Sequence, residues 1–409
     1  MASLHPSAPK YGPALIGTLG LLSMVGPLAT DMYLPGFPQV AEHLHASSGA
    51  VQLTLSLFMV GMGLGQLVWG PLSDIVGRRG PLVAAGAVFA VASLLAALAP
   101  DITWLTVWRF VQGFTGSAGV VIGRAIARDV SGGVELARLF GFIGIVNGLA
   151  PVLAPVLGGL LIGLIGWRGV LLVLTGIAAL MLVASVLVLG ESLPGERRLV
   201  GGMRALARST ATVLRDRSFL GFTLSQVFGF GVLFTWISSS SVVLQLLYGL
   251  DSTRFALCMA VFAVCTLVAG SLNTRLVRRV AMWRLLIGGL LIDVVMAGAL
   301  LVVVLAWGGT LPPLWLLLVL ACLVGAPFPL IMANSMTLGL ARHGRGAGMA
   351  SAVMGALQYG MAALVSPIVT ITGSVSLTTV AVTMAVCALL AALSALVCAP
   401  ESRSIAGLR

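Results

Sequence analysis

The sequence predicts an all-α membrane protein whose twelve transmembrane helices form two pseudo-symmetric bundles of six. Three observations support this fold. Of the 409 residues, 59% are apolar and only 9% are charged, whereas soluble domains carry about 25% charged residues. Nearly the whole chain reads as apolar blocks of about 20 residues, the length that crosses a hydrocarbon core and that must be helical there. Finally, the segment Gly70–Gly80 returns in the second half as Gly270–Val280.

The apolar blocks set the expected helices in order along the chain. We place them at 13–36, 50–71, 80–99, 102–124, 138–162, 167–190, 219–247, 252–274, 283–306, 313–338, 346–372 and 375–398. An even number of spans puts both termini on one side of the membrane. No block is followed by a polar stretch long enough to be a soluble domain.

The arginines indicate which side is the cytoplasm. If the N-terminus is inside, nearly all basic residues fall in cytoplasmic segments, and the outer loops hold only Arg168 and Arg254. This is the positive-inside distribution of a multi-pass protein. The net charge of +11 therefore orients helices, and we expect no nucleic-acid partner.

The longest polar segment divides the chain into three parts. We expect an N-terminal six-helix bundle at 1–190, a cytoplasmic linker at 191–217 and a C-terminal six-helix bundle at 218–409. Within the linker, Ala205–Leu214 can form an amphipathic helix on anionic lipid. A simple tether between the bundles is an equally good interpretation.

The two halves repeat each other at two places. GPLSDIVGRRG (Gly70–Gly80) and GSLNTRLVRRV (Gly270–Val280) share a glycine, a leucine and two arginines. NGLAPVLAP (Asn147–Pro155) and YGMAALVSP (Tyr359–Pro367) both fall in the fifth span of their half. Parallel repeats around a central cavity are typical of transporters.

Charged residues inside the spans are the sharpest site candidates, because burying each one costs at least about 2.5–3.5 kcal/mol. Asp31 and Arg109 both lie about six residues below the outer surface, roughly 9 Å deep, so they can meet. We predict a proton-coupling pair; the alternatives are a fixed ion pair or a carboxylate that caps a helix break near Pro35. Asp293 is the one acid in the middle of the second half, and we expect a structural role or one not yet defined.

Uncharged polar residues within the spans are candidates for the substrate cavity. Gln112 shares a helix face with Arg109. The others are Asn147, Asn334, Gln358 and Tyr359. Each of them can instead hold neighbouring helices together.

The fifth span carries a pattern of small residues and prolines. Gly148, Pro151, Pro155 and Gly158 allow close packing and free backbone carbonyls, so the helix can bend. We predict a hinge or gate between the halves; plain packing is the alternative.

Cysteine and histidine usage excludes several functions. The five cysteines fall in or beside apolar blocks, and the four histidines lie near termini or loops. This pattern gives no metal site and no disulfide framework. An enzyme needs clustered catalytic groups at one depth, and a receptor needs no repeated half, so we expect neither.

These motifs together resemble a known family. GPLSDIVGRRG (Gly70–Gly80) is similar to the loop 2–3 signature of the major facilitator superfamily. DMYLP (Asp31–Pro35), RFVQG (Arg109–Gly113), APVLAPVLGG (Ala150–Gly159) and Ala333–Pro367 are similar to its Bcr/CflA group of drug:proton antiporters. The resemblance covers essentially the whole chain.

The resemblance implies export of lipophilic or amphipathic drugs, such as chloramphenicol or bicyclomycin, driven by the proton gradient without a cofactor. It implies that Asp31 and Arg109 respond to protons and substrate. It also implies a latch at the inner membrane surface, in which Asp74 joins arginines of the fourth span. The latch candidates are Asp74, Arg78, Arg79, Arg124 and Arg128.

Two positions depart from the family's pattern. Ile75 stands where the signature is usually basic, and Thr274 replaces the acid in the second repeat. We expect a monomer in a bacterial cytoplasmic membrane, with both termini cytoplasmic. The alternative function is a proton-linked exporter or importer of an endogenous metabolite.

Overall fold

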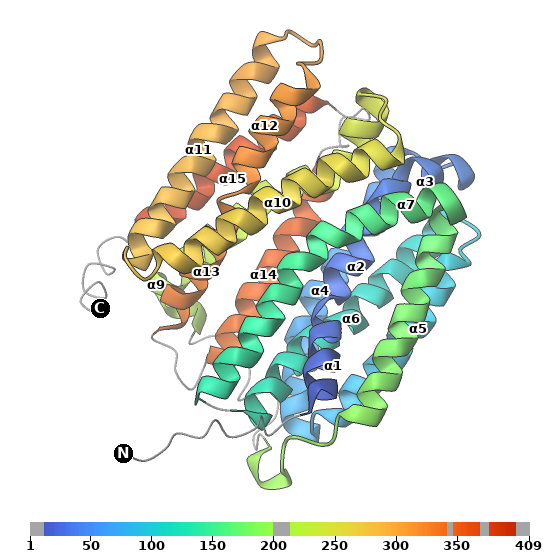
Figure 1. Ribbon diagram of the computed structural model, residues 1–409, viewed down its shortest axis with the longest axis vertical. Helices are drawn as coiled ribbons and strands as arrows, with labels where there is room; N and C mark the ends of the chain where they lie inside the picture. The colour runs from blue at the N-terminus through green and yellow to red at the C-terminus, as the bar shows by residue number, and fades with distance from the viewer. Residues whose placement is uncertain (1–11, 132, 199–212, 342–346, 369–375, 398–409) are drawn as a thin grey trace.

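The computed structural model describes residues 12–131, 133–198, 213–341, 347–368 and 376–397, and in these ranges the chain is helical without strands (Figure 1). Nine of the described helices are long and apolar enough to cross a membrane, and a bent pair near the N-terminus makes ten. Helix α6 is not among them, and α7 holds two spans. Each of the twelve expected helices therefore has a counterpart.

The N-terminal half contains the helices up to α7. They are α1 (Pro13–Ser23), α2 (Val25–Asp31), the short 3-10 helix η1 (Leu34–Gly36), α3 (Phe37–His43), α4 (Ser48–Val76), α5 (Arg79–Ala97), α6 (Ile102–Val130) and α7 (Gly133–Val188). The expected first span is not one straight helix, because α1 and the segment from Val25 to His43 meet at a bend of 43°. Pro27 follows the bend closely and lacks the backbone N–H that a continuous helix needs. Gly166, with a φ of 68°, separates the fifth and sixth spans within α7.

The C-terminal half contains the helices from α9 onward. They are α9 (Arg217–Ser241) with its π-helical continuation η3 (Val242–Leu247), α10 (Ser252–Leu276), α11 (Met282–Ala306), α12 (Leu314–Gly325), α13 (Phe328–Leu340), α14 (Ala347–Ile368) and α15 (Leu377–Val397). The expected tenth span is broken into α12 and α13 at Pro327. The possible linker helix Ala205–Leu214 lies almost entirely outside the described residues.

Glycines set the close approach of α4 to α6 in the N-terminal half. A Cβ atom on Gly113 would collide with the backbone oxygen of Phe58, and one on Gly61 would collide with that of Phe110. Gly65 approaches Ser117 in the same way. Small residues four apart allow such packing between membrane helices. This contact holds Arg109 of α6 against the Phe58 side of α4.

The two halves meet along two helix pairs, α4 with α14 and α7 with α10. A Cβ atom on Gly63 would lie 3.1 Å from the Ala356 oxygen. Gly159 packs as closely, since its Cβ atom would lie 2.7 Å from the Ser252 oxygen. These small residues let the two bundles touch through their backbones.

Two hydrogen bonds between described residues join the halves, and both lie at one end of the molecule. Gln52 Nε2 donates to the Ser238 oxygen at 3.1 Å. Gln245 Nε2 donates to the Pro35 oxygen at 3.2 Å. We call this the Gln245 end, and we call the opposite end, where α4 meets α5, the Arg78 end.

Candidate functional site

Asp31 is the last residue of α2, and its side chain is buried. The hydroxyl of Thr30 donates to Asp31 Oδ1 at 2.9 Å. No arginine, lysine or histidine of the described residues lies within ion-pair distance of this carboxylate. Asp31 is thus a buried acid held by one hydroxyl.

Arg109 lies in the middle of the N-terminal half with 0% of its side chain exposed. Its Nη1 donates to Gln112 Oε1 at 2.6 Å, and Gln112 Nε2 donates onward to the Ser93 hydroxyl of α5 at 2.8 Å. The guanidinium also lies over the rings of Tyr33 and Phe58, at 4.8 and 4.4 Å from their centroids. Aromatic faces stabilise a desolvated cation by about 2 kcal/mol.

The fixed ion pair between Asp31 and Arg109, one of the two alternatives to a proton-coupling pair, is absent from the ion pairs of the described residues. Arg109 Nε and Nη2 have no hydrogen-bond partner among the described residues, although both atoms are buried. Aromatic rings and an amide occupy the space around the guanidinium instead. The guanidinium therefore keeps two buried donors that no described residue accepts. The interpretation as a fixed salt bridge is wrong for this conformation.

The C-terminal half presents an aromatic surface toward α2. A Cβ atom on Gly26 would lie 3.6 Å from the Tyr359 hydroxyl oxygen. The Tyr359 ring meets Phe230 edge-on at 6.3 Å, and Phe230 also contacts Phe328 at 5.4 Å. Tyr359, a predicted cavity residue, thus lies where the two halves face each other.

The other predicted cavity residues either lie beside the aromatic surface or hold neighbouring groups of the protein in place. Gln358 accepts a hydrogen bond from Gln226 Nε2 at 2.7 Å, and both lie beside the aromatic surface on α14 and α9. Asn334 is buried and donates to Asn273 Oδ1 at 2.9 Å, so it ties α13 to α10. Gln112 orients Arg109. The helix-holding alternative therefore describes Asn334 better than a role in the cavity does.

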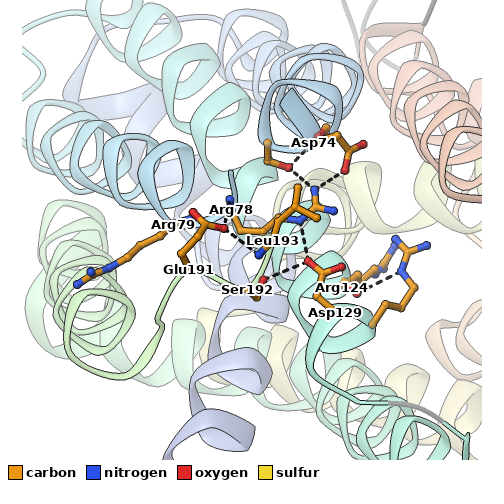
Figure 2. A network of polar contacts seen from close by, with 11 residues as sticks. Asp74, Arg78, Arg79, Arg124, Asp129, Glu191, Ser192 and Leu193 are labelled. Carbon is orange, nitrogen blue, oxygen red and sulfur yellow. Dashed lines mark hydrogen bonds and ion pairs between the residues drawn. The ribbon is translucent and has the colours of Figure 1, made fainter. Parts of the chain in front are cut away.

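Charged residues form a network at the Arg78 end (Figure 2). Arg78 Nη1 forms a short ion pair with Asp74 Oδ1 of α4. Arg78 Nε forms a second ion pair with Asp129 Oδ2 of α6 at 2.9 Å. Burial alone lowers the pKa of Arg78, but the two carboxylates offset this effect and raise it. The guanidinium therefore connects α4, α5 and α6 as a permanent cation.

The start of the linker completes this network. Glu191 accepts hydrogen bonds from the backbone N–H groups of Arg78 at 2.8 Å and Arg79 at 3.3 Å, at the first turn of α5. A carboxylate is favourable at a helix N-terminus. Partial burial raises the pKa of Glu191, but these backbone donors outweigh it, so the pKa lies below its usual value. Ser192 donates to Asp129 Oδ2 at 3.1 Å.

The latch expected from the resemblance has different partners here. Asp74 pairs with Arg78 rather than with the arginines of α6. Arg128 Nε donates to the Arg124 backbone oxygen at 3.4 Å. Arg79 Nη2 donates to the Val186 oxygen near the end of α7. Sequence reasoning missed Asp129 and Glu191, although both are acids directly beside the ends of apolar blocks.

The predicted hinge helix lies between the halves. A Cβ atom on Gly158 would collide with the backbone of Met32, and the next residue, Gly159, faces α10 of the other half. Pro155 is buried in α7. The side chains of Asn147 and Pro151 and the surroundings of Gly148 lie outside the described residues, although the backbone of all three belongs to α7. Bending at these positions stays a prediction.

Comparisons with known proteins identify the class of this all-helical membrane protein. Residues 19–367 match the Major Facilitator Superfamily. The chain belongs to this family; it is a multi-pass membrane transporter of small molecules and not an enzyme.

Several bacterial proteins are similar over most of their length. An uncharacterized MFS-type transporter, YdgK of Bacillus subtilis, is 36% identical over 90% of each chain. A bicyclomycin resistance protein homolog of Haemophilus influenzae is 32% identical over 86% of this chain and 87% of its own. The multidrug resistance protein MdtL of Vibrio parahaemolyticus is 28% identical over 60% of this chain and 62% of its own.

Solved structures share the fold. The D-xylose–proton symporter superposes with a TM-score of 0.69 at 15% identity, covering 92% of this chain and 96% of its own. A bacterial homolog of the human lysosomal transporter Spinster gives a TM-score of 0.70 at 15% identity, with coverages of 97% and 98%.

Proposed function

We propose that this protein is a proton-coupled exporter of lipophilic or amphipathic drugs in a bacterial cytoplasmic membrane. The proposal is carried by the burial of Asp31, an acid that has no ion pair with any described residue and that ends α2, the helix facing Tyr359 of the other half. An acid in this position can bind and release a proton as its access to water changes. We propose that the protein acts as a monomer with both termini in the cytoplasm.

The proposed substrate surface consists of Tyr359, Phe230 and Phe328, with the Gln226–Gln358 pair beside them. Aromatic groups with a few polar atoms suit amphipathic ligands of varied shape. The relatives named for bicyclomycin and multidrug resistance support drugs as the substrates.

In the proposed cycle, the Arg78 end lies in the cytoplasm, which the distribution of arginines along the sequence supports. The hydrogen bonds at the Gln245 end then join the halves on the outer side, and we propose that substrate enters from the cytoplasm. Deprotonated Asp31 admits the drug, the halves rock about α7 and α14, and Asp31 takes a proton outside. Each proton that returns inward gains about 2.3 kcal/mol per 100 mV of membrane potential.

In the cycle, the Arg78 network holds the inner ends of α4, α5 and α6 together. These three helices then move as one body when the halves rock. Arg109, whose remaining donors have no partner among the described residues, can pair with Asp31 or with a polar group of the substrate in another conformation.

A drug-susceptibility panel tests the proposal. Cells that express the protein should tolerate more bicyclomycin or chloramphenicol than control cells, and a protonophore should remove the protection. Protection that survives collapse of the gradient would exclude proton coupling. Uptake of a metabolite without any drug protection would instead favour the alternative of a metabolite transporter.

A further inference from the structure

Asp293 is a second buried acid, in the C-terminal half and far from the site described above along the chain. It lies in the middle of α11, and its side chain is 1% exposed. Both of its carboxylate oxygens are buried without a hydrogen-bond partner among the described residues. A buried ion without a partner is so unfavourable that the group normally becomes neutral instead.

No cation is available from the helices that surround Asp293. Helix α11 packs mainly against α12, α13 and α15, and its Trp283 also meets Phe222 of α9, a helix whose one charged residue, Arg217, is its first. The titratable groups of these three helices are the thiols Cys322 and Cys387, and none of the three carries a charged residue. The other charge of α11 is Arg284, nine residues away, or about 14 Å along the helix. A permanent salt bridge to a neighbouring helix therefore does not explain this acid.

The break between α12 and α13 lies beside Asp293. Gly289 is one turn from Asp293 on the same face of α11. A Cβ atom on Gly289 would lie 3.7 Å from the Pro327 oxygen and 3.6 Å from Leu330 Cβ. Because α11 and α12 run antiparallel, the step of one turn from Gly289 to Asp293 along α11 corresponds to the last turn of α12, just before the break.

The break leaves backbone carbonyls in this region without their usual hydrogen-bond donors. Pro327 and Pro329 have no N–H, so the carbonyls of Leu323 and Gly325 lose their usual helical donors. A protonated carboxyl group can donate to such a carbonyl, whereas an ionised carboxylate cannot. The local chemistry therefore favours a proton on Asp293.

We propose that Asp293 is a second proton-binding site, located in the C-terminal half and independent of Asp31. In this conformation the carboxyl group carries its proton. The broken helix α12–α13 provides the movable part of the wall, and its rearrangement exposes the group to water and lets the proton leave. That this proton joins the transport cycle rests on the proposed function; that Asp293 binds a proton does not.

Infrared spectroscopy of the purified full-length protein tests this inference, with protons and D2O as the only probes. At neutral pH the wild type should show the carbonyl stretch of a protonated carboxyl group, and D2O should shift it. Asp293→Asn should remove that absorption, and Asp293→Glu should keep it at a changed frequency. Asp31→Asn is the matched control and should leave the Asp293 absorption in place.

Two results would overturn the inference. Identical protonated-carboxyl absorption in the wild type and Asp293→Asn would show that Asp293 is ionised. Absorption that D2O never shifts, at any pH at which the protein stays folded, would show a trapped proton and no binding site. If Asp293→Asn does not fold, Asp293→Glu takes its place. A changed carbonyl frequency in that variant shows that the group is protonated, and an unchanged spectrum shows that it is ionised. Failure of drug export in cells would leave the infrared result unaffected.

Discussion

The two halves carry the same loop motif but use different chemistry in it. In the N-terminal copy, Arg78 forms ion pairs with Asp74 and Asp129. In the C-terminal copy, Thr274 takes the place of the acid and donates to the Ser271 oxygen, while Asn273 accepts from Asn334. A repeated sequence thus gives an ionic network in one half and neutral hydrogen bonds in the other.

The same contrast holds among the polar residues within the membrane spans. The N-terminal half buries Asp31 and Arg109, whereas the C-terminal half places the neutral pair Gln226 and Gln358 beside an aromatic surface. Charge movement is therefore expected mainly in the first half and drug contact mainly in the second. Asp293 is the exception, a buried acid in the second half, so measuring whether it carries a proton tests how far this contrast holds.

The largest expected effect comes from Asp31→Asn, which removes the titrating group from the first half. Proton-driven drug export should fall to the level of cells without the protein, because an amide cannot exchange a proton. Growth at graded drug concentrations measures this. The matched change Gln358→Ala should alter which drugs are exported but keep the dependence on the gradient. If both variants lost proton coupling equally, the two halves would not differ in the way proposed.

A smaller but clear loss is expected from Arg109→Lys. The ammonium group keeps the charge but cannot stack on Tyr33 and Phe58 or present a planar donor fork. With about 1.4 kcal/mol of interaction lost, transport should fall about tenfold. Initial rates in membrane vesicles, corrected for protein amount, check this. A transport rate equal to that of the wild type would mean that the contacts of Arg109 with the two aromatic rings do not contribute to transport.

The two copies of the loop motif should contribute differently to the thermal stability of the protein. Arg78→Gln removes two ion pairs of a largely buried guanidinium, whereas Arg278 is exposed and has no ion pair among the described residues. We expect Arg78→Gln to lower the melting temperature by about 5 °C and Arg278→Gln to leave it nearly unchanged. Thermal unfolding in detergent measures both variants, and equal shifts would contradict the asymmetry.

The smallest effect concerns Glu191 and depends on pH. Its pKa is lowered in the folded protein, so its contribution is complete above the ordinary glutamate pKa of about 4.3 and disappears as the pH falls below that value. The wild type should therefore melt slightly higher than Glu191→Gln at pH 7, and the difference should shrink in acid. A difference that grows in acid would show that the carboxylate is not the stabilising form.

Much of the fold was predictable because hydropathy and loop arginines act locally. Each expected span has a helical counterpart, but the breaks at Met24 and Pro327 were not predicted, since a proline in a membrane helix either bends or interrupts it. The burial of Asp31 and Arg109 followed from their depth in apolar blocks. Their lack of an ion pair did not, because Tyr33 and Phe58 reach Arg109 only through tertiary packing.

The partners of the loop network were also beyond sequence reasoning. Glu191 reaches the Arg78 backbone across more than a hundred residues of chain, and no local pattern relates the two. Asn334 is a similar case: its position in a membrane span suggested a cavity, and only the packing of α13 on α10 shows its partner Asn273. Polar residues within the spans can thus be located from the sequence, but their roles cannot be assigned from it.

Proton release on drug binding tests the central claim most directly. Purified protein in weak buffer with a pH indicator is mixed with bicyclomycin or chloramphenicol, whichever the susceptibility panel identifies. The account predicts that the wild type and Asp293→Asn release a proton, and that Asp31→Asn binds the drug without this release. Undiminished proton release from Asp31→Asn would contradict the assignment of coupling to the N-terminal half.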